Sequence, residues 1–435
     1  MLTRPFLIIA MSMFTATMGL GMVLPLLPVY AESFGASGAT IGLTMSAFAI
    51  PQLFVSPFIG RLADRFGRKP FLMLGAAAYF ASAIGWWSAE TLAMLIAFRA
   101  LSGIGSALIF SNAQAYVGDL APSGSEGRYM GAFAVADFLG FGLGPLFAGV
   151  IRDVAGLDEV FLAMATLYLV VFVVIWLLLP SQPVRLQLGT TKITAPWGQI
   201  FRHPTMQALM FLRICFALAT GVAMSFLAVH LEESLAVTAT MVGLVFAVQQ
   251  ITGGLSQPFF GRLADRFPRS WLVFFGTATM AAGMSTIVWS DSYWVILAGM
   301  LIGPGLGAAL ANVSAQAMQI DTGRDLGMAT VASLGSAAFA AGFLLGAIGG
   351  GRLVDATSIP TAFLLASGVM VFGGTVFLVR VRDLQARATA AASAAAAAAV
   401  SAVASVLPTP REDIEGGESL DTPAPPTPPS SPALS

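Results

Sequence analysis

Gly60-Arg-Leu-Ala-Asp-Arg-Phe66 recurs residue for residue as Gly261-Arg-Leu-Ala-Asp-Arg-Phe267, 201 positions later. Each copy follows one long apolar segment and precedes another. A second repeat, at an offset of 202, pairs Gly103-Ile-Gly-Ser-Ala-Leu108 with Gly305-Leu-Gly-Ala-Ala-Leu310 and Gln114 with Gln316. Two segments in each half keep one register, so the chain consists of two halves built on the same plan.

The composition indicates that lipid is the solvent of this chain. Of its 435 residues, 57% are hydrophobic and 10% are charged, whereas about a quarter of the residues in soluble domains are charged. A bilayer-spanning helix needs about 20 apolar residues. Ten-residue alternation, which a membrane β-barrel would show, is not found. We predict an all-α polytopic protein with twelve spans, near residues 6–29, 40–60, 71–89, 91–117, 128–151, 160–180, 205–229, 240–260, 271–289, 293–318, 327–350 and 360–380.

Several classes of site are excluded by residue types that the sequence hardly uses. Cys215 is the single cysteine, and His203 and His230 are the only histidines, so neither an intramolecular disulfide nor a Cys/His metal cluster is expected. The two lysines, Lys69 and Lys192, lie outside any phosphate-loop pattern. We therefore expect no metal, cofactor, nucleotide or nucleic acid, and an ion gradient as the source of energy.

The positive charges sort by side of the membrane. Of the two sets of loops, one contains nearly every Arg and Lys, and the other contains only Arg152 and Arg352. Because Lys and Arg collect in cytoplasmic loops, we predict a multi-pass protein of the cell membrane with both termini in the cytoplasm. The first span begins almost at Met1 and is too long for a signal peptide, so we expect it to remain as an anchor.

The chain is expected to contain four parts. Residues 1–180 form one six-helix half, 181–204 a polar cytoplasmic linker, 205–382 the second half, and 383–435 a cytoplasmic tail. The tail is rich in Ala and then in Pro, Ser and Thr, and we expect disorder from Leu407 onward. Parallel halves of this kind are typical of transporters, whose substrate site lies between the halves near the midplane.

The loop after the second span resembles the signature of the major facilitator superfamily, and the resemblance extends over residues 5–382. It is carried by Gly60, Leu62, Ala63, Asp64, Arg65, Gly67, Arg68 and Lys69. In the fourth span Leu95, Arg99, Gly103, Gly105 and Ala107 look like the second motif of that superfamily. The resemblance implies the major facilitator fold.

Two further motifs resemble those of the twelve-span drug/proton antiporter family. The fifth span has the glycine-rich antiporter motif, and the first span has the proline motif. Their residues are Gly131, Gly140, Gly144, Pro145 and Gly149 in the fifth span, and Gly21, Pro25, Pro28 and Tyr30 in the first. The resemblance implies that the glycine motif packs helices closely and seals the path against leak.

The loop motif is expected to act as a gate. The resemblance implies that Asp64, Arg68 and Lys69 form a charge network that latches the two halves together in one state. Gly60 and Gly67 let the backbone and neighbouring helices approach closely, and Arg65 belongs to the same gating motif. A contact present in only one state biases the equilibrium between states. The second copy, with Asp265 and Arg266, should be a weaker gate, because Pro268 and Ser270 replace the glycine and lysine of the first.

Three charged residues lie well within predicted spans: Arg99, Asp137 and Arg213. Such residues are costly in lipid and should face the protein interior or a water-filled cavity. Asp137 is the candidate proton carrier, with structural anchoring of the fifth span as the alternative. Arg99 would tune the proton step by resemblance, but its depth argues against a direct ion pair with Asp137. Arg213 could face Asp137 across the cavity.

The polar candidates for the cavity wall are Asn112, Gln114, Gln249, Gln250, Asn312 and Gln316, together with Arg213. One interior carboxylate against two interior arginines does not favour dications. We therefore predict that the substrate is a lipophilic solute that is neutral or carries one charge.

The leading hypothesis is export of small lipophilic compounds in exchange for protons by alternating access. The first alternative is a proton-coupled carrier of one metabolite, such as a sugar or an amino-acid derivative. A more remote alternative is a membrane sensor that does not transport. An enzyme is not expected, because the spans contain no paired carboxylates, nucleophile triad or metal cluster. Each chain contains both halves, so we expect a monomer.

Overall fold

The computed structural model describes residues 3–120, 126–180, 202–326 and 328–406, and within them it leaves out some side chains, including those of residues 60, 61, 64, 65 and 126–128. The chain forms two compact units, Met1–Leu384 and Gln385–Ser435.

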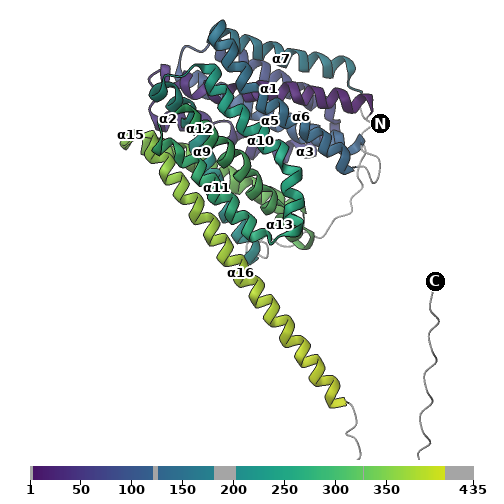
Figure 1. Ribbon diagram of the computed structural model, residues 1–435. Helices are drawn as coiled ribbons and strands as arrows, with labels where there is room; N and C mark the ends of the chain where they lie inside the picture. Colours follow the sequence, from purple (N-terminus) through teal and green to yellow (C-terminus); the bar gives the residue numbers. More distant parts are fainter. Residues whose placement is uncertain (1–2, 121–125, 181–201, 327, 407–435) are drawn as a thin grey trace, which may run out of the picture. The chain divides into compact units, whose positions relative to one another are not determined.

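The first half of the unit is a bundle of helices. Its central helix α1 (Arg4–Ser33) packs against α6 (Glu126–Val154) and α7 (Leu157–Leu178), and α4 (Arg68–Trp87) packs against α5 (Leu92–Leu120) and α7 (Figure 1). The remaining helices are α2 (Gly38–Ser46) and α3 (Ala49–Phe66).

The second half repeats this order. Helix α9 (Pro204–Leu235) packs against α14 (Met328–Leu344), and α11 (Arg269–Trp289) packs against the η1 turn (Leu301–Gly307) and α13 (Ala308–Leu326). The other elements are α10 (Ala239–Arg266), α12 (Tyr293–Met300), η2 (Leu345–Gly349), α15 (Gly350–Ala356) and α16 (Ile359–Val406). The halves meet where α6 packs against α10, and where α2 packs against η2 and α15.

Within the described residues, 11 helices are long and apolar enough to cross a membrane. The remaining predicted span, near 40–60, is split into α2 and α3 at Ala47 and Phe48. Pro51 explains the break, because its nitrogen cannot donate to the carbonyl four residues earlier and its ring crowds that carbonyl. With this span in two pieces, the predicted all-α fold of twelve spans in two related halves is confirmed.

Two segments depart from regular α-helix in a way that the sequence did not predict. Leu301–Gly307 and Leu345–Gly349 are π-helical. Pro304 lies inside the first of them, and a missing N–H favours such a rearrangement of the hydrogen-bond ladder. Single π-helical turns are frequent at functional sites.

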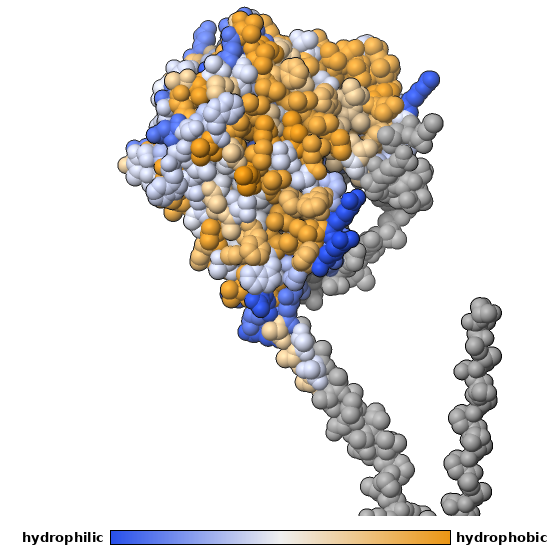
Figure 2. All heavy atoms as spheres, in the orientation of Figure 1, coloured by the Kyte–Doolittle hydropathy of each residue, from blue (hydrophilic) through white to orange (hydrophobic). Residues whose placement is uncertain are grey.

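The surface of the helical bundle matches a lipid environment. Figure 2 shows broad hydrophobic areas on the visible face, and large apolar side chains such as Trp289, Trp294 and Leu177 are more than half exposed. The interior is also apolar. Its largest cluster of buried hydrophobic side chains contains residues of both halves.

Most of the predicted linker and the end of the tail lie outside the described residues. These parts are 181–201 of the linker and 407–435 of the tail. Before position 407 the alanine-rich run is helical, since α16 continues to Val406.

Candidate functional site

A cavity of about 310 Å³ lies between α6, α9, α10, α11, η1, α13 and α14, at the middle of the spans. Its volume is at the lower end of the range of small-molecule sites. Five phenylalanines line it, from four helices: Phe138, Phe141, Phe216, Phe246 and Phe339. Phe138 and Phe141 come from the first half, so both halves contribute to the wall.

Side-chain amides supply the polar part of the cavity wall. They are Gln249, Gln250, Gln257 and Asn312. None of the described side chains that line this cavity carries a charge. The sequence identified three of the four amides, and it missed Gln257, which lies about two helical turns beyond Gln249 on α10.

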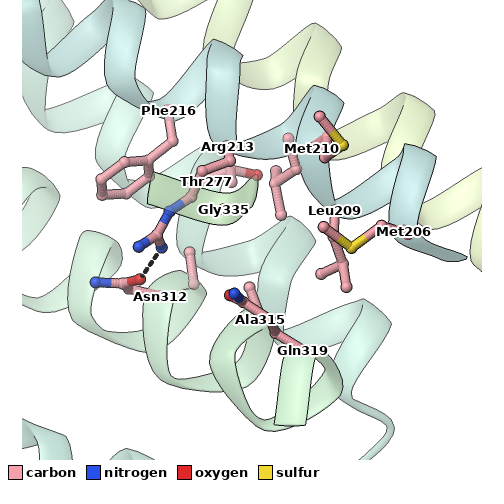
Figure 3. A pocket seen from close by; sticks show the side chains of 12 residues that line it. Met206, Leu209, Met210, Arg213, Phe216, Thr277, Asn312, Ala315, Gln319 and Gly335 are labelled. Carbon is pink, nitrogen blue, oxygen red and sulfur yellow. Dashed lines mark hydrogen bonds between the residues drawn. The ribbon is translucent and has the colours of Figure 1, made fainter. Parts of the chain in front are cut away.

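Arg213 lies beside this cavity rather than in its wall. Its Nη1 donates to Oδ1 of Asn312 at 2.7 Å, and its guanidinium carbon lies 5.6 Å from the centre of the Phe339 ring. Figure 3 shows Arg213 reaching from α9 toward Asn312 within a narrower pocket that both residues line. Asn312 is thus common to the two pockets.

The other predicted wall residues lie elsewhere. Asn112 is buried, and its Nδ2 donates to the Leu108 carbonyl of its own helix at 2.7 Å. Gln114 and Gln316 are exposed, and the Nε2 of Gln316 donates to Oδ1 of Asn312 at 3.3 Å. None of these three is among the residues that line the two pockets.

Asp137 lies on α6 next to Phe138 of the cavity wall. Its backbone oxygen accepts a hydrogen bond from Oγ1 of Thr17 on α1, at 3.2 Å. Among the described residues, no hydrogen bond or ion pair to its carboxylate is found. The Asp137 side chain is half-buried.

Arg99 is buried in the first half, with 3% of its surface exposed. Its guanidinium carbon lies 4.7 Å from the centre of the Phe48 ring, at the break between α2 and α3. Its Nε and Nη1 have no hydrogen-bond partner in the described part of the chain, and no ion pair joins it to Asp137 there.

The glycine motif of α6 brings α1 and α10 close. A Cβ on Gly144 would meet the carbonyl oxygen of Met18, and one on Gly149 would meet that of Ala239. Gly140 faces Phe14 in the same way, while Gly131 faces open space. Pro145 lies inside α6.

The proline motif lies on α1, opposite the glycine motif. A Cβ on Gly21 would meet the Phe141 carbonyl, and Pro25 and Pro28 lie inside the helix. The hydroxyl of Tyr30 donates to the Ala89 carbonyl at 3.2 Å.

The loop motif makes contacts within its own half. Gly67 has a φ of 84°, which favours glycine. Next to it, Nη2 of Arg68 lies 3.2 Å from Oδ2 of Asp119, and Nζ of Lys69 donates to the Trp176 carbonyl at 2.8 Å. The structure does not describe the surroundings of Gly60 or the side chains of Asp64 and Arg65.

The second copy of the loop motif repeats the first ion pair. Arg269 pairs with Asp321, at positions that follow Arg68 and Asp119 by 201 and 202 residues. Asp265 and Arg266 are exposed at the end of α10. We call the end of the bundle that carries both loop copies the motif end.

At the opposite end, which we call the cap end, two aspartates join the halves. The carboxylate of Asp153, at the end of α6, accepts from the backbone N–H groups of Ala239 and Thr240 at 3.0 and 2.8 Å. These groups lie in the first turn of α10. Arg152 adds an ion pair with Glu232 of α9. In this pair Nη2 of Arg152 donates to Oε2 of Glu232 at 2.9 Å.

Asp355, at the end of α15, makes the equivalent contacts with α2. It accepts from the backbone N–H groups of Gly38 and Ala39 at 2.5 and 3.0 Å. Carboxylates are stabilising at helix N-termini, where N–H groups lack partners. The cap end is therefore held closed at two places, which sequence reasoning missed because neither aspartate lies in a recognised motif.

Comparison with known proteins gives a family match over both halves. The family model described as Major Facilitator Superfamily matches residues 9–217 and again 209–411. An uncharacterised MFS-type transporter of Methanocaldococcus jannaschii is 23% identical, over 87% of this chain and 99% of its own length. Multidrug resistance protein 2 of Bacillus subtilis is 26% identical, over 85% of this chain and 93% of its own length.

Solved structures share the fold. A mutant of the nucleoside transporter NupG has a TM-score of 0.74 at 15% identity, covering 86% of this chain and 99% of its own. A bacterial homologue of the human lysosomal transporter Spinster, in an inward-facing and unoccupied conformation, has a TM-score of 0.70 at 17% identity. It covers 86% of this chain and 94% of its own.

Proposed function

Because the chain belongs to the major facilitator superfamily, we propose that it exports small lipophilic compounds in exchange for protons by alternating access. The cavity lined by five phenylalanines carries this proposal, since apolar and aromatic walls with few polar groups suit drug-like molecules. The relative named as a multidrug resistance protein supports the same function.

The closed cap end supports alternating access. The contacts of Asp153 and Asp355 join the halves on one side of the cavity, so the substrate enters or leaves this state from the motif end. We place the motif end in the cytoplasm, with both termini there and the protein in the cell membrane as a monomer. The state described is then the one that loads substrate from the cytoplasm.

Asp137 is the proposed proton carrier. Its place beside Phe138 brings it near the cavity wall, and the lack of a fixed partner allows its protonation to follow the hydration of the cavity. Arg99 would tune this step through its buried positive charge, and the glycine motif would seal α6 against α1 and α10.

The test uses purified protein in vesicles with an imposed pH gradient and a panel of lipophilic neutral and cationic dyes. Dye-dependent proton flux is expected in the wild type and is expected to be lost in Asp137→Asn. Asp158→Asn, which alters an exposed carboxylate at the start of α7, is the matched control and should retain flux. Flux that persists in Asp137→Asn would place the proton site elsewhere.

A second candidate function is favoured by the four amides of the cavity wall. Amides both donate and accept hydrogen bonds, and a site built to bond a polar substrate rejects analogues that lack the matching groups. A carrier of one polar metabolite would fit them. The breadth of the dye panel decides: transport of many unrelated dyes supports drug export, and transport of none favours the metabolite carrier.

A further inference from the structure

Arg213 is a charged residue in a membrane span that has no counter-ion among the described residues. The spanning helix α9 contains it, and its polar contact is with the neutral amide oxygen of Asn312. Its Nε is buried without a hydrogen-bond partner in the described part of the chain. Arg213 as a whole is half-buried. Because a charge within a membrane span is stabilised by an opposite charge, this guanidinium is poised to accept an anion.

Its position connects it to the substrate cavity. Asn312, which accepts from Arg213, also lines the central cavity, as do Phe216 and Phe339. Phe216 follows Arg213 by about one turn of α9, and the Phe339 ring faces the guanidinium. Rotation of the Asn312 side chain would therefore open the guanidinium to a solute among these two rings.

The neighbouring charges do not favour a cation. No described side chain that lines the central cavity is a carboxylate, and Asp137 lies next to the wall without being part of it. Arg99 is covered by Phe48 in the other half of the bundle. The charged group in contact with the amides of the cavity wall is thus the guanidinium of Arg213, which is positive.

We propose that Arg213 is the anion-recognition residue of the transporter, and that its substrates include aromatic compounds with one carboxylate. The inference rests on the proposed export function and narrows its substrate class. The carboxylate replaces the Asn312 oxygen as acceptor, and hydrogen bonds between a guanidinium and a carboxylate are about twice as strong as bonds to neutral acceptors. The aromatic ring packs against Phe216 and Phe339.

The test compares three probes of one shape in reconstituted vesicles: 2-naphthoate, its neutral amide 2-naphthamide, and 2-naphthylmethylammonium. The wild type should transport naphthoate at least about tenfold better than the ammonium compound. Arg213→Gln should lower naphthoate transport at least about tenfold and change naphthamide transport by less than about twofold. Arg382→Gln is the matched control, because Arg382 also lies over an aromatic ring, that of Trp271, but is exposed.

An unchanged ratio of naphthoate to naphthamide transport in Arg213→Gln would overturn the assignment, as would a wild type that carries naphthamide but not naphthoate. A wild type that carries dyes of the panel but none of these three probes would overturn the assignment and leave the export function standing. Arg213→Lys keeps the charge and guards against a folding defect in Arg213→Gln. It should retain naphthoate selectivity, and naphthoate should raise the Tm of the wild-type protein more than naphthamide does.

Discussion

Asp153 and Asp355 occupy equivalent positions of the two halves, 202 residues apart, and each carboxylate caps the first turn of a helix in the opposite half. The capped residues, Ala239 and Gly38, are 201 positions apart. The internal repeat thus produces two related contacts that close one end of the cavity.

Replacing these caps should open the cap end. The negative charge of a carboxylate at a helix N-terminus contributes about 0.3–1 kcal/mol. Because the contacts exist only while the halves are closed there, each Asp→Asn change should shift the equilibrium by up to about fivefold. The double variant Asp153→Asn with Asp355→Asn should shift it further. The measurement is the labelling rate of Thr220→Cys, a residue of the cavity wall, by an impermeant maleimide added at the cap end, in a Cys215→Ser background.

Asp158→Asn serves as the control for cap removal, because Asp158 lies in the first turn of α7, a helix of its own half. It should leave the labelling rate unchanged. Equal rates in the wild type and the double cap variant would show that the caps do not hold the cap end closed.

Gly144 should be far less tolerant of a side chain than Gly131, although both belong to the same motif. A Cβ on Gly144 would collide with backbone atoms of α1, whereas one on Gly131 would enter open space. Overpacking costs about 1–3 kcal/mol, and alanine at an open helical position is favoured over glycine by about 1 kcal/mol. Gly144→Ala should lower the Tm and Gly131→Ala should not. A Tm loss of similar size in both would argue against close packing at Gly144.

The ion pairs of the two loop copies should differ in strength. The side chains of Arg68 and Asp119 are 15% and 31% exposed, and those of Arg269 and Asp321 are 29% and 55% exposed. Exposed pairs contribute about 0–1 kcal/mol, and less exposed pairs are screened less. Arg68→Gln should therefore lower the Tm more than Arg269→Gln, and the difference should persist at high salt. A larger loss of Tm in Arg269→Gln than in Arg68→Gln would contradict the prediction that the first ion pair is the stronger.

The sequence predicted the fold better than the contacts. Apolar length and the repeated heptapeptide were sufficient for twelve spans in two halves, because both are properties of the chain itself. The caps of Asp153 and Asp355 were not predicted, since they join residues distant in sequence and use backbone N–H groups, which carry no sequence signal. Gln249, Gln250 and Asn312 line the cavity as expected. Gln114 and Gln316, which occupy equivalent positions of the repeat, were expected in the wall too, but both are exposed.

Membrane potential should act more strongly on an anionic substrate than on a neutral one. Export of naphthamide in exchange for one proton would move one charge, and export of naphthoate would move two in the same electrical direction. One charge across 100 mV is worth about 2.3 kcal/mol, and about 1.4 kcal/mol is tenfold in a gradient. A change of about 60 mV should therefore change the naphthamide gradient about tenfold and the naphthoate gradient about a hundredfold. Vesicles with a potential set by potassium and valinomycin would measure this, after subtraction of the leak in protein-free vesicles. If the two gradients depended equally on membrane potential, the naphthoate charge would not be crossing the membrane during transport. That result would contradict the exchange of an anion for one proton.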